Sequence, residues 1–264
     1  MARHGALNTF GRSGNPIIRS PAFKNTAGTK NEMTLDGAVN KTGLSLFMVV
    51  VMAALVWTFN DNSLVMLLSY VALLSGSIAA VVTFGFIWPL PPVWLIKPRP
   101  HLAPKTMYIY ALGEGAFVAH ISMFFEAAYP GIVIQAVSLT FFVAASLLFA
   151  YKSGIIKPTQ NFLLIMFAAT MGIFLFYLFA LIMYLVTGSS LGVISGNSNM
   201  AIIMSLFIVG IAALNLVLDF DIIEQSADQG APKYMEDFGA MALTATLVWL
   251  YAEILRLIAK LRSR

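Results

Sequence analysis

Residues 161–186 read NFLLIMFAATMGIFLFYLFALIMYLV, and no charged side chain interrupts this stretch. A helix needs about 20 apolar residues to cross the hydrocarbon core of a bilayer, so the stretch predicts a membrane-spanning helix. Seven stretches of this kind, or close to it in length, occur in the chain. Their approximate limits are 43–59, 64–87, 106–125, 131–150, 161–186, 200–223 and 238–259.

The composition of the whole chain agrees with a protein embedded in lipid. Of its 264 residues, 59% are hydrophobic and 11% are charged, whereas an average soluble domain carries about 25% charged residues. So few charges do not coat a water-soluble globule, which argues against a soluble enzyme. Because the backbone inside a bilayer must satisfy its own hydrogen bonds, we expect an all-α bundle of seven transmembrane helices.

Several classes of functional site find no support in the sequence. The chain has no cysteine, which excludes disulfides, thiolate metal sites and a cysteine nucleophile. His4, His101 and His120 are too scattered to suggest a zinc site, and no phosphate-binding glycine loop or hydrolase motif occurs. We therefore expect no enzymatic activity, no metal and no cofactor, and we attribute the net charge of +4 to membrane topology rather than to nucleic-acid binding.

The N-terminal region differs from everything that follows it. Up to Lys41 it contains six basic and two acidic residues, and it has no apolar run of the kind that a signal peptide needs. This composition predicts a cytosolic, largely disordered basic tail over residues 1–42, followed by a transmembrane domain over residues 43–264. Within the tail, Thr34 is expected to cap a short helix that ends near Gly43.

The distribution of Lys and Arg predicts the orientation of the chain. Of 16 such residues, 11 fall in the tail and in the loops 88–105 and 151–160, whereas the connectors 60–63, 126–130 and 187–199 have none. The positive-inside rule then places the N-terminus in the cytosol. We expect the chain to lie in the inner or plasma membrane of the cell. Seven crossings put the basic segment Lys260–Arg264 on the far side. Either the last segment crosses only partly or the earlier loops dominate, and we favour seven crossings.

Ionisable side chains within the spans are the most informative residues, because a carboxylate at the bilayer centre costs at least ~2.5 kcal/mol. Asn215 and Asp219 are four residues apart and share one helix face. Asp221 points the other way, near a helix end, and is interpreted either as a solvated interfacial acid or as part of a site. Glu253 has Arg256 at i+3, so it is either the neutralised half of an ion pair or a functional carboxyl.

Two more polar residues lie in the third stretch, 106–125. Glu114 stands between Gly113 and Gly115, whose small size permits close helix approach, and it is either an interhelical strut or a functional acid. His120 lies on an apolar background, where a histidine is more often a satisfied core residue than a ligand or a proton relay.

Short runs in a specific order resemble a known family. In the C-terminal third they are NLVLDFD (215–221), GAPKYM (230–235) and LVWLYAEILR (247–256). Through these runs the chain is similar to the Bax inhibitor family (YccA-like, with the transmembrane Bax inhibitor motif), in its bacterial branch with a long N-terminal tail. The earlier runs that carry the similarity include Asn15-Pro16, Glu114-Gly115, YPGIV (129–133), Gln135-Ala136 and Tyr151-Lys152.

The resemblance implies a bundle whose last helix is central and wrapped by the other six. It also implies a pH-sensitive calcium leak that is gated by one acid in the sixth helix and one in the seventh. Asp219 matches the sixth-helix acid, Glu253 stands where the family usually has Asp, and Phe220 replaces the threonine of the family's Asp-Thr pair. Calcium ions are then the transported species, and the lipid bilayer and a membrane protease are the expected partners.

A gate of this kind needs its two acids to meet. Two neighbouring carboxyls in a low dielectric share one proton, which would pin the sixth and seventh helices together until deprotonation drives them apart. A hairpin that turns within 224–237 leaves Asp219 and Glu253 at depths that differ by over ~10 Å. The two acids therefore meet only if the seventh helix starts late or the sixth runs on past Glu224. The expected modifiers of this gate are Glu114, Asn215, Asp221 and Arg256.

A second class of function stays open at this point. The chain is alternatively a non-transporting regulator that binds a membrane protease or another membrane partner through its exposed tail. Removal of residues 1–41 separates the two, because a regulator then loses its function whereas a leak persists.

Overall fold

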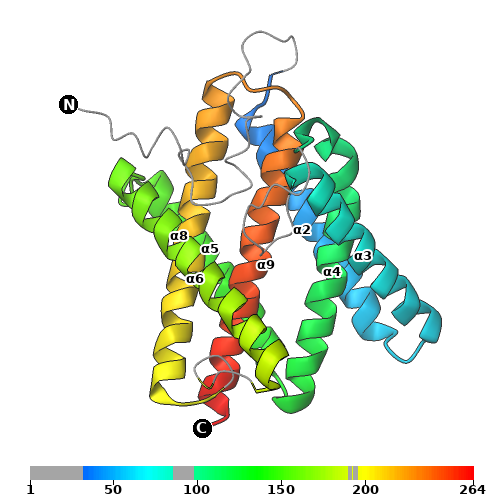
Figure 1. Ribbon diagram of the computed structural model, residues 1–264. Coiled ribbons are helices and arrows are strands. Elements are labelled where there is room, and N and C mark those ends of the chain that lie inside the picture. The colour runs from blue at the N-terminus through cyan, green and yellow to red at the C-terminus, as the bar shows by residue number, and fades with distance from the viewer. Residues whose placement is uncertain (1–31, 86–97, 190–191, 193–195) are drawn as a thin grey trace.

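The computed structural model describes residues 32–85, 98–189, 192 and 196–264 (Figure 1). Seven helices in this part of the chain are long and apolar enough to cross a membrane, which confirms the predicted all-α transmembrane bundle. A short 3-10 helix, η2 (Pro100–Leu102), precedes the third of them. The seven are α2 (Leu35–Thr58), α3 (Ser63–Phe84), α4 (Ala103–Ala128), α5 (Ile132–Lys152), α6 (Gln160–Thr187), α8 (Asn199–Asp228) and α9 (Met235–Arg262).

Side-chain caps explain where several of these helices begin. A helix leaves its first N–H groups without partners, and the oxygen of a preceding Ser, Thr or Asn satisfies some of them. This is the role of Thr34 before α2, Asn62 before α3, Thr159 before α6 and Ser198 before α8.

The helix limits differ from the sequence-based limits mainly at α2 and at the last hairpin. The cap predicted at Thr34 is present, but α2 then continues without a break to Thr58, so the first span starts well before residue 43. Helix α8 runs on to Asp228, and α9 begins already at Met235, which leaves a loop of only 229–234. Of the predicted tail, residues 1–31 lie outside the described part of the chain.

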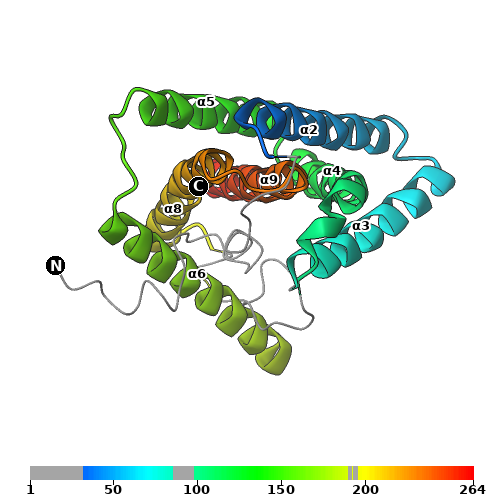
Figure 2. The same ribbon diagram turned by 90° about the horizontal axis from the view of Figure 1, so that it is seen from above.

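Helix α9 lies at the centre of the bundle (Figure 2). Of its most apolar 18 residues, 89% are buried, compared with 50% for α8 and 22% for α3 and α6. Its main neighbours are α2, α4, α5 and α8, while α3 packs on α4 and α6 packs on α8. The predicted central position of the last helix is thus confirmed, with four helices as its principal wall rather than six.

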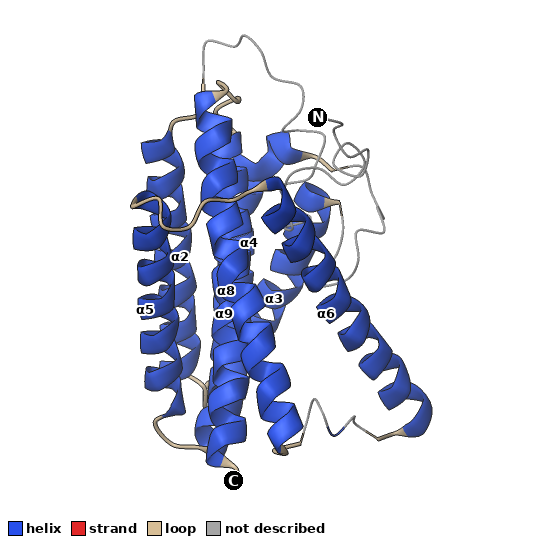
Figure 3. Cartoon of the chain, turned by 90° about the vertical axis from the view of Figure 1, so that its left-hand side faces the viewer, coloured by secondary structure: helices blue, strands red, loops and turns tan. Residues whose placement is uncertain are grey.

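The two ends of α9 lie at opposite ends of the bundle (Figure 3). At its start, the backbone N–H of Met33 donates to the carbonyl of Ala231, so the beginning of α2 lies beside the α8–α9 loop. At its end, the Arg262 guanidinium donates to the carbonyl of Pro130 over 2.8 Å, in the turn between α4 and α5. The basic C-terminal segment therefore lies on the side opposite to Leu35, as seven crossings require.

Candidate functional site

Glu253 forms the centre of a buried polar cluster on α9. Its side chain is 1% exposed, and its Oε1 accepts from Arg256 Nη1 over 2.6 Å and from Trp249 Nε1 over 3.2 Å. The hydroxyl of Tyr177 on α6 lies 3.1 Å from both carboxylate oxygens. Of the two interpretations that the sequence left open, the structure therefore shows the Glu253–Arg256 ion pair.

Arg256 connects this carboxylate to α6. Its Nη1 also donates to the Tyr177 hydroxyl over 3.3 Å, and its guanidinium carbon lies 5.6 Å from the centre of the Tyr177 ring. A cation placed over an aromatic face gains further electrostatic stabilisation. The cluster consequently holds a charge pair inside the bundle with several mutual contacts, and it ties α6 to the central helix although α6 packs mainly on α8.

Asp219 lies deep in the bundle on α8, where its side chain is 0% exposed. One turn earlier on the same face, the buried Asn215 amide donates to Thr170 Oγ1 over 3.0 Å and to the Ile211 carbonyl over 2.9 Å. A carboxyl at this depth is costly in any membrane protein, and such groups mark functional sites by default.

The register of α8 against α9 determines how these two acids are placed. The 229–234 loop at one end and the 2.7 Å hydrogen bond from Lys260 Nζ to Ser205 Oγ near the other end fix the antiparallel alignment. This alignment puts Asp219 roughly level with Thr244, and Glu253 lies nine residues further along, or about 13 Å at 1.5 Å per residue. Helix α8 runs on past Glu224 to Asp228, but α9 begins early, at Met235, so the centre of the loop hardly moves and the expected depth difference persists.

Asp221 belongs to a different group at the end of α8. It accepts from Gln225 Nε2 over 2.7 Å and from the Tyr151 hydroxyl of α5 over 3.4 Å. The same hydroxyl also donates to Glu224. Asp221 is half-buried and has polar partners on α5 and α8.

Glu114 lies where α4 approaches its neighbours most closely. A methyl group on Gly113 would lie 2.6 Å from Cα of Gly76 on α3, and one on Gly115 would lie 2.6 Å from the Val49 carbonyl oxygen on α2. Small residues are typical of such close crossings in membranes. The glycines around Glu114 therefore perform the packing role that the sequence indicates.

His120 is a satisfied core residue with contacts to α3. Its Nδ1 lies 2.7 Å from the Ala116 carbonyl oxygen, and its Nε2 lies 3.5 Å from Ser69 Oγ. The Tyr70 ring packs on the imidazole with the ring centres 4.9 Å apart. Within the described ranges, moreover, no three His, Asp or Glu side chains gather as a metal site would need.

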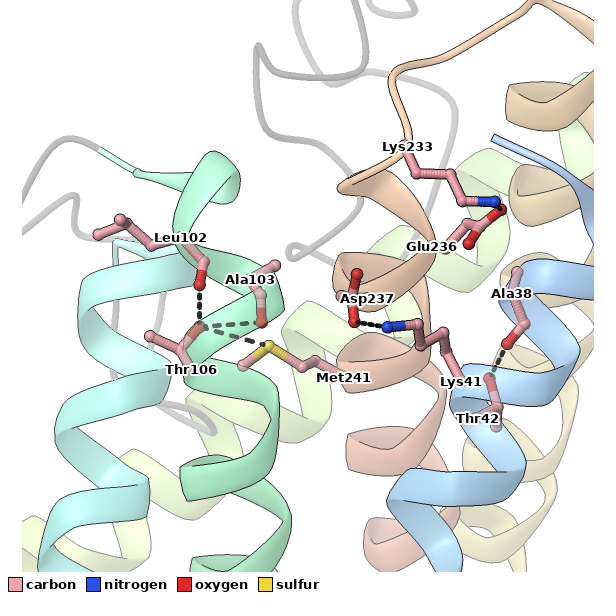
Figure 4. A network of polar contacts seen from close by, with 10 residues as sticks. All are labelled: Ala38, Lys41, Thr42, Leu102, Ala103, Thr106, Lys233, Glu236, Asp237 and Met241. Carbon is pink, nitrogen blue, oxygen red and sulfur yellow. Dashed lines mark hydrogen bonds and ion pairs between the residues drawn. The ribbon is translucent and has the colours of Figure 1, made fainter. Parts of the chain in front are cut away.

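Sequence reasoning missed a second set of buried charges, at the start of α9 (Figure 4). Glu236 and Asp237 are 1% and 4% exposed; Lys233 Nζ lies 2.8 Å from the Glu236 carboxylate, and Lys41 Nζ lies 2.9 Å from that of Asp237. These acids fall at the edge of an apolar stretch, where the sequence predicts a solvated connector. Lys41, the partner of Asp237, is almost 200 positions away in the sequence, and no local pattern indicates this pair.

Seven apolar helices, one of them central and carrying buried charges, define a multi-pass membrane protein in contact with the lipid bilayer. The model of the Bax inhibitor 1 like family matches residues 15–263, and the chain belongs to this family. No curated protein matches the chain, and no solved structure matches it.

Proposed function

We propose that the protein is a pH-sensitive cation leak of the inner or plasma membrane, permeable to calcium, with Asp219 and Glu253 as its gate carboxyls. The observation that carries the proposal is the complete burial of the Asp219 side chain within an apolar helix that packs on the central helix. Membership in the Bax inhibitor 1 like family supports it. Calcium prefers carboxylate and carbonyl oxygens, so an acidic path through the bundle suits this ion.

The two acids act at different depths in this proposal. Asp219 takes up and releases a proton beside the middle of α9, whereas Glu253 is kept in place by Arg256 and Tyr177. Deprotonation of Asp219 adds a negative charge in a low-dielectric region, which favours an arrangement that admits water or a cation. Because α9 touches both sites, a shift of this helix connects the proton on Asp219 to the ion pair at Glu253.

The orientation proposed for this leak has the N-terminus in the cytosol. On the side of the bundle where α2 begins, the described basic residues outnumber those at the opposite end, which agrees with the positive-inside rule. The basic residues at the far end have local hydrogen-bonding partners, since Lys260 binds Ser205 and Arg262 binds the turn carbonyl of Pro130. These hydrogen bonds give a structural reason for the two basic residues that depart from the positive-inside rule.

Flux measurements on an Asp219→Asn variant test the proposal, with Asp228→Asn as the matched control. In proteoliposomes, Asp219→Asn should abolish the pH dependence of calcium flux because it removes the titrating group. Asp228→Asn makes the same change at an exposed acid at the end of the same helix and should keep the wild-type profile. A pH profile that is unchanged in Asp219→Asn would contradict the gate.

The same assay separates the leak from a regulator that binds a membrane protease. The deletion must end at residue 31 rather than at residue 41, because Thr34 caps α2 and Lys41 pairs with Asp237. A leak should keep its flux without residues 1–31. Absence of flux from the full chain, together with loss of activity in cells after this deletion, would favour the regulator.

A further inference from the structure

The first described residues of the chain are attached to the loop that leads into the central helix. Glu32 and Pro232 form an antiparallel bridge, and the Met33 N–H donates to the Ala231 carbonyl over 2.6 Å. The Met33 side chain is 3% exposed, so this attachment has an apolar part as well. The start of α2 and the start of α9 are therefore held side by side before either helix enters the bundle.

Thr34 and Gly37 form an incomplete capping box at the start of α2. The Thr34 hydroxyl accepts from the N–H of Gly37 over 3.0 Å, which is the first half of the motif. In a complete capping box, a Glu or Gln at the third helical position reaches back to the N–H of the capping residue. That position is Gly37 here, which has no side chain.

Glu236 of α9 supplies the missing side chain from another helix. Its Oε1 accepts from the Thr34 N–H over 2.9 Å and from the Thr34 hydroxyl over 2.9 Å. The carboxylate occupies the space that a Cβ on residue 37 would take, because an ideal Cβ there would overlap Glu236 Oε1. Gly37 is thus required for close approach of the carboxylate, and α9 completes the cap of α2.

We propose that Glu236 is the positioning residue that fixes the start of the central helix against α2, and that opening this interhelical capping box increases the leak. We call the group Met33, Thr34, Gly37, Ala231 and Glu236 the capping clip. The first part of the inference stands on the geometry alone. The second part, the effect on flux, rests on the proposed function.

We expect the capping clip to open as a unit rather than by degrees, for a physical reason. A carboxylate that is 1% exposed is tolerated because Thr34 and Lys233 donate to it. If only some of these donors are lost, the Glu236 carboxylate stays buried with too few hydrogen-bond partners, which costs free energy. The carboxylate therefore moves into water once its donors separate from it. The Lys41–Asp237 pair lies one residue further along α9 and is expected to yield together with the clip.

A pair of glycine substitutions on α2 tests the clip. Gly37→Ala places a methyl group where the Glu236 carboxylate lies, whereas Gly43→Ala places one where nothing lies within 4 Å. Both changes replace glycine by alanine in the same helix, where alanine is the better helix former, so faster exchange in Gly37→Ala alone reports on the clip. We expect hydrogen exchange of the amides in 33–38 and 235–239 to rise about tenfold in Gly37→Ala, the size typical of a lost cap, and to stay unchanged in Gly43→Ala.

A reversible disulfide gives the opposite perturbation. The chain contains no cysteine, and facing residues of an antiparallel bridge have Cα atoms about 4.5–5.5 Å apart, which suits a disulfide. Glu32→Cys combined with Pro232→Cys should therefore lock the clip on oxidation. In proteoliposomes, Gly37→Ala should raise calcium flux several-fold, oxidation of the cysteine pair in that background should restore the wild-type flux, and reduction should reverse this.

These readouts separate failure of the clip from failure of the leak. Equal hydrogen exchange in Gly37→Ala and Gly43→Ala would overturn the positioning role of Glu236. Faster exchange with unchanged flux, in a wild type that conducts, would overturn the connection to the leak. If no variant conducts, the proposed function is refuted, and the exchange data still decide whether Glu236 positions α9.

Discussion

Helices α6 and α9 both contain 28 residues, yet they are built in opposite ways. Helix α6 contains no charged residue, and 22% of its most apolar stretch is buried; α9 is less apolar, and 89% of the corresponding stretch is buried. In water the more apolar helix would take the centre of a bundle. In lipid the order is reversed, because polar groups must find their partners inside the protein.

The contact between α6 and α9 shows how the central helix finds partners for its polar groups. Tyr177 is a single polar group in an otherwise apolar part of α6, and it meets Glu253 and Arg256 of α9. The rest of α6 faces α8 or the membrane, with Phe179 and Leu185 more than half exposed. Helix α6 therefore provides one polar contact to this cluster, whereas the central helix carries its charge pair.

The largest effect is expected from breaking the charge pair at the centre. Arg256→Ala leaves the buried Glu253 carboxylate without its cation, which should cost about 3 kcal/mol of unfolding free energy, the lower end for a buried pair, because the Arg256 side chain is 39% exposed. Reversible unfolding in mixed micelles measures this loss. The double variant Glu253→Gln with Arg256→Ala should recover a large part of it, and a loss below about 1 kcal/mol in Arg256→Ala would show that the pair is not tightly coupled.

The next effect concerns a charge placed on the outer helix. Leu175 lies near the middle of α6 and is 55% exposed on the lipid-facing side. Leu175→Lys should raise the apparent free energy of membrane insertion by about 2.5–3.5 kcal/mol, because no partner lies inside the protein for it. An insertion assay with Leu175→Met as the control measures this. Equal insertion of both variants would refute the assignment of α6 to the lipid boundary.

The smallest effect distinguishes close packing from open helix surface. Gly113→Ala forces α3 and α4 apart at Gly76 and should cost about 1–3 kcal/mol of unfolding free energy. Gly172→Ala on α6 meets nothing within 4 Å and should leave stability unchanged or raise it by up to about 1 kcal/mol. The comparison is made in the same unfolding assay. Equal responses would contradict the close α3–α4 contact.

The sequence predicts the helices well because each span needs its own apolar run. It offers the Glu253–Arg256 pair as one of two interpretations because i and i+3 lie on one helix face. The partners from other helices escape it. Tyr177 is one aromatic residue among many in α6, so no periodicity distinguishes it. The incomplete cap Thr34–Gly37 carries a local signal, but the residue that completes it is 202 positions away.

The depth of the two acids shows a different kind of limit. The separation of Asp219 and Glu253 follows from where the α8–α9 loop lies, and the sequence indicates that loop correctly to within a few residues. The proton-sharing pair implied by the family resemblance requires a contact that this register does not favour. Their role as gate carboxyls remains a prediction for the flux measurements to decide.

The central position of α9 has a consequence for how the protein is made. Helix α9 follows the other six along the chain. The ribosome therefore releases the central helix of the bundle after the helices that surround it. Until then, the faces of α2, α4, α5 and α8 that cover α9 have only lipid or one another as neighbours. The membrane insertion machinery must therefore accept last the one of the seven helices that carries the most charges.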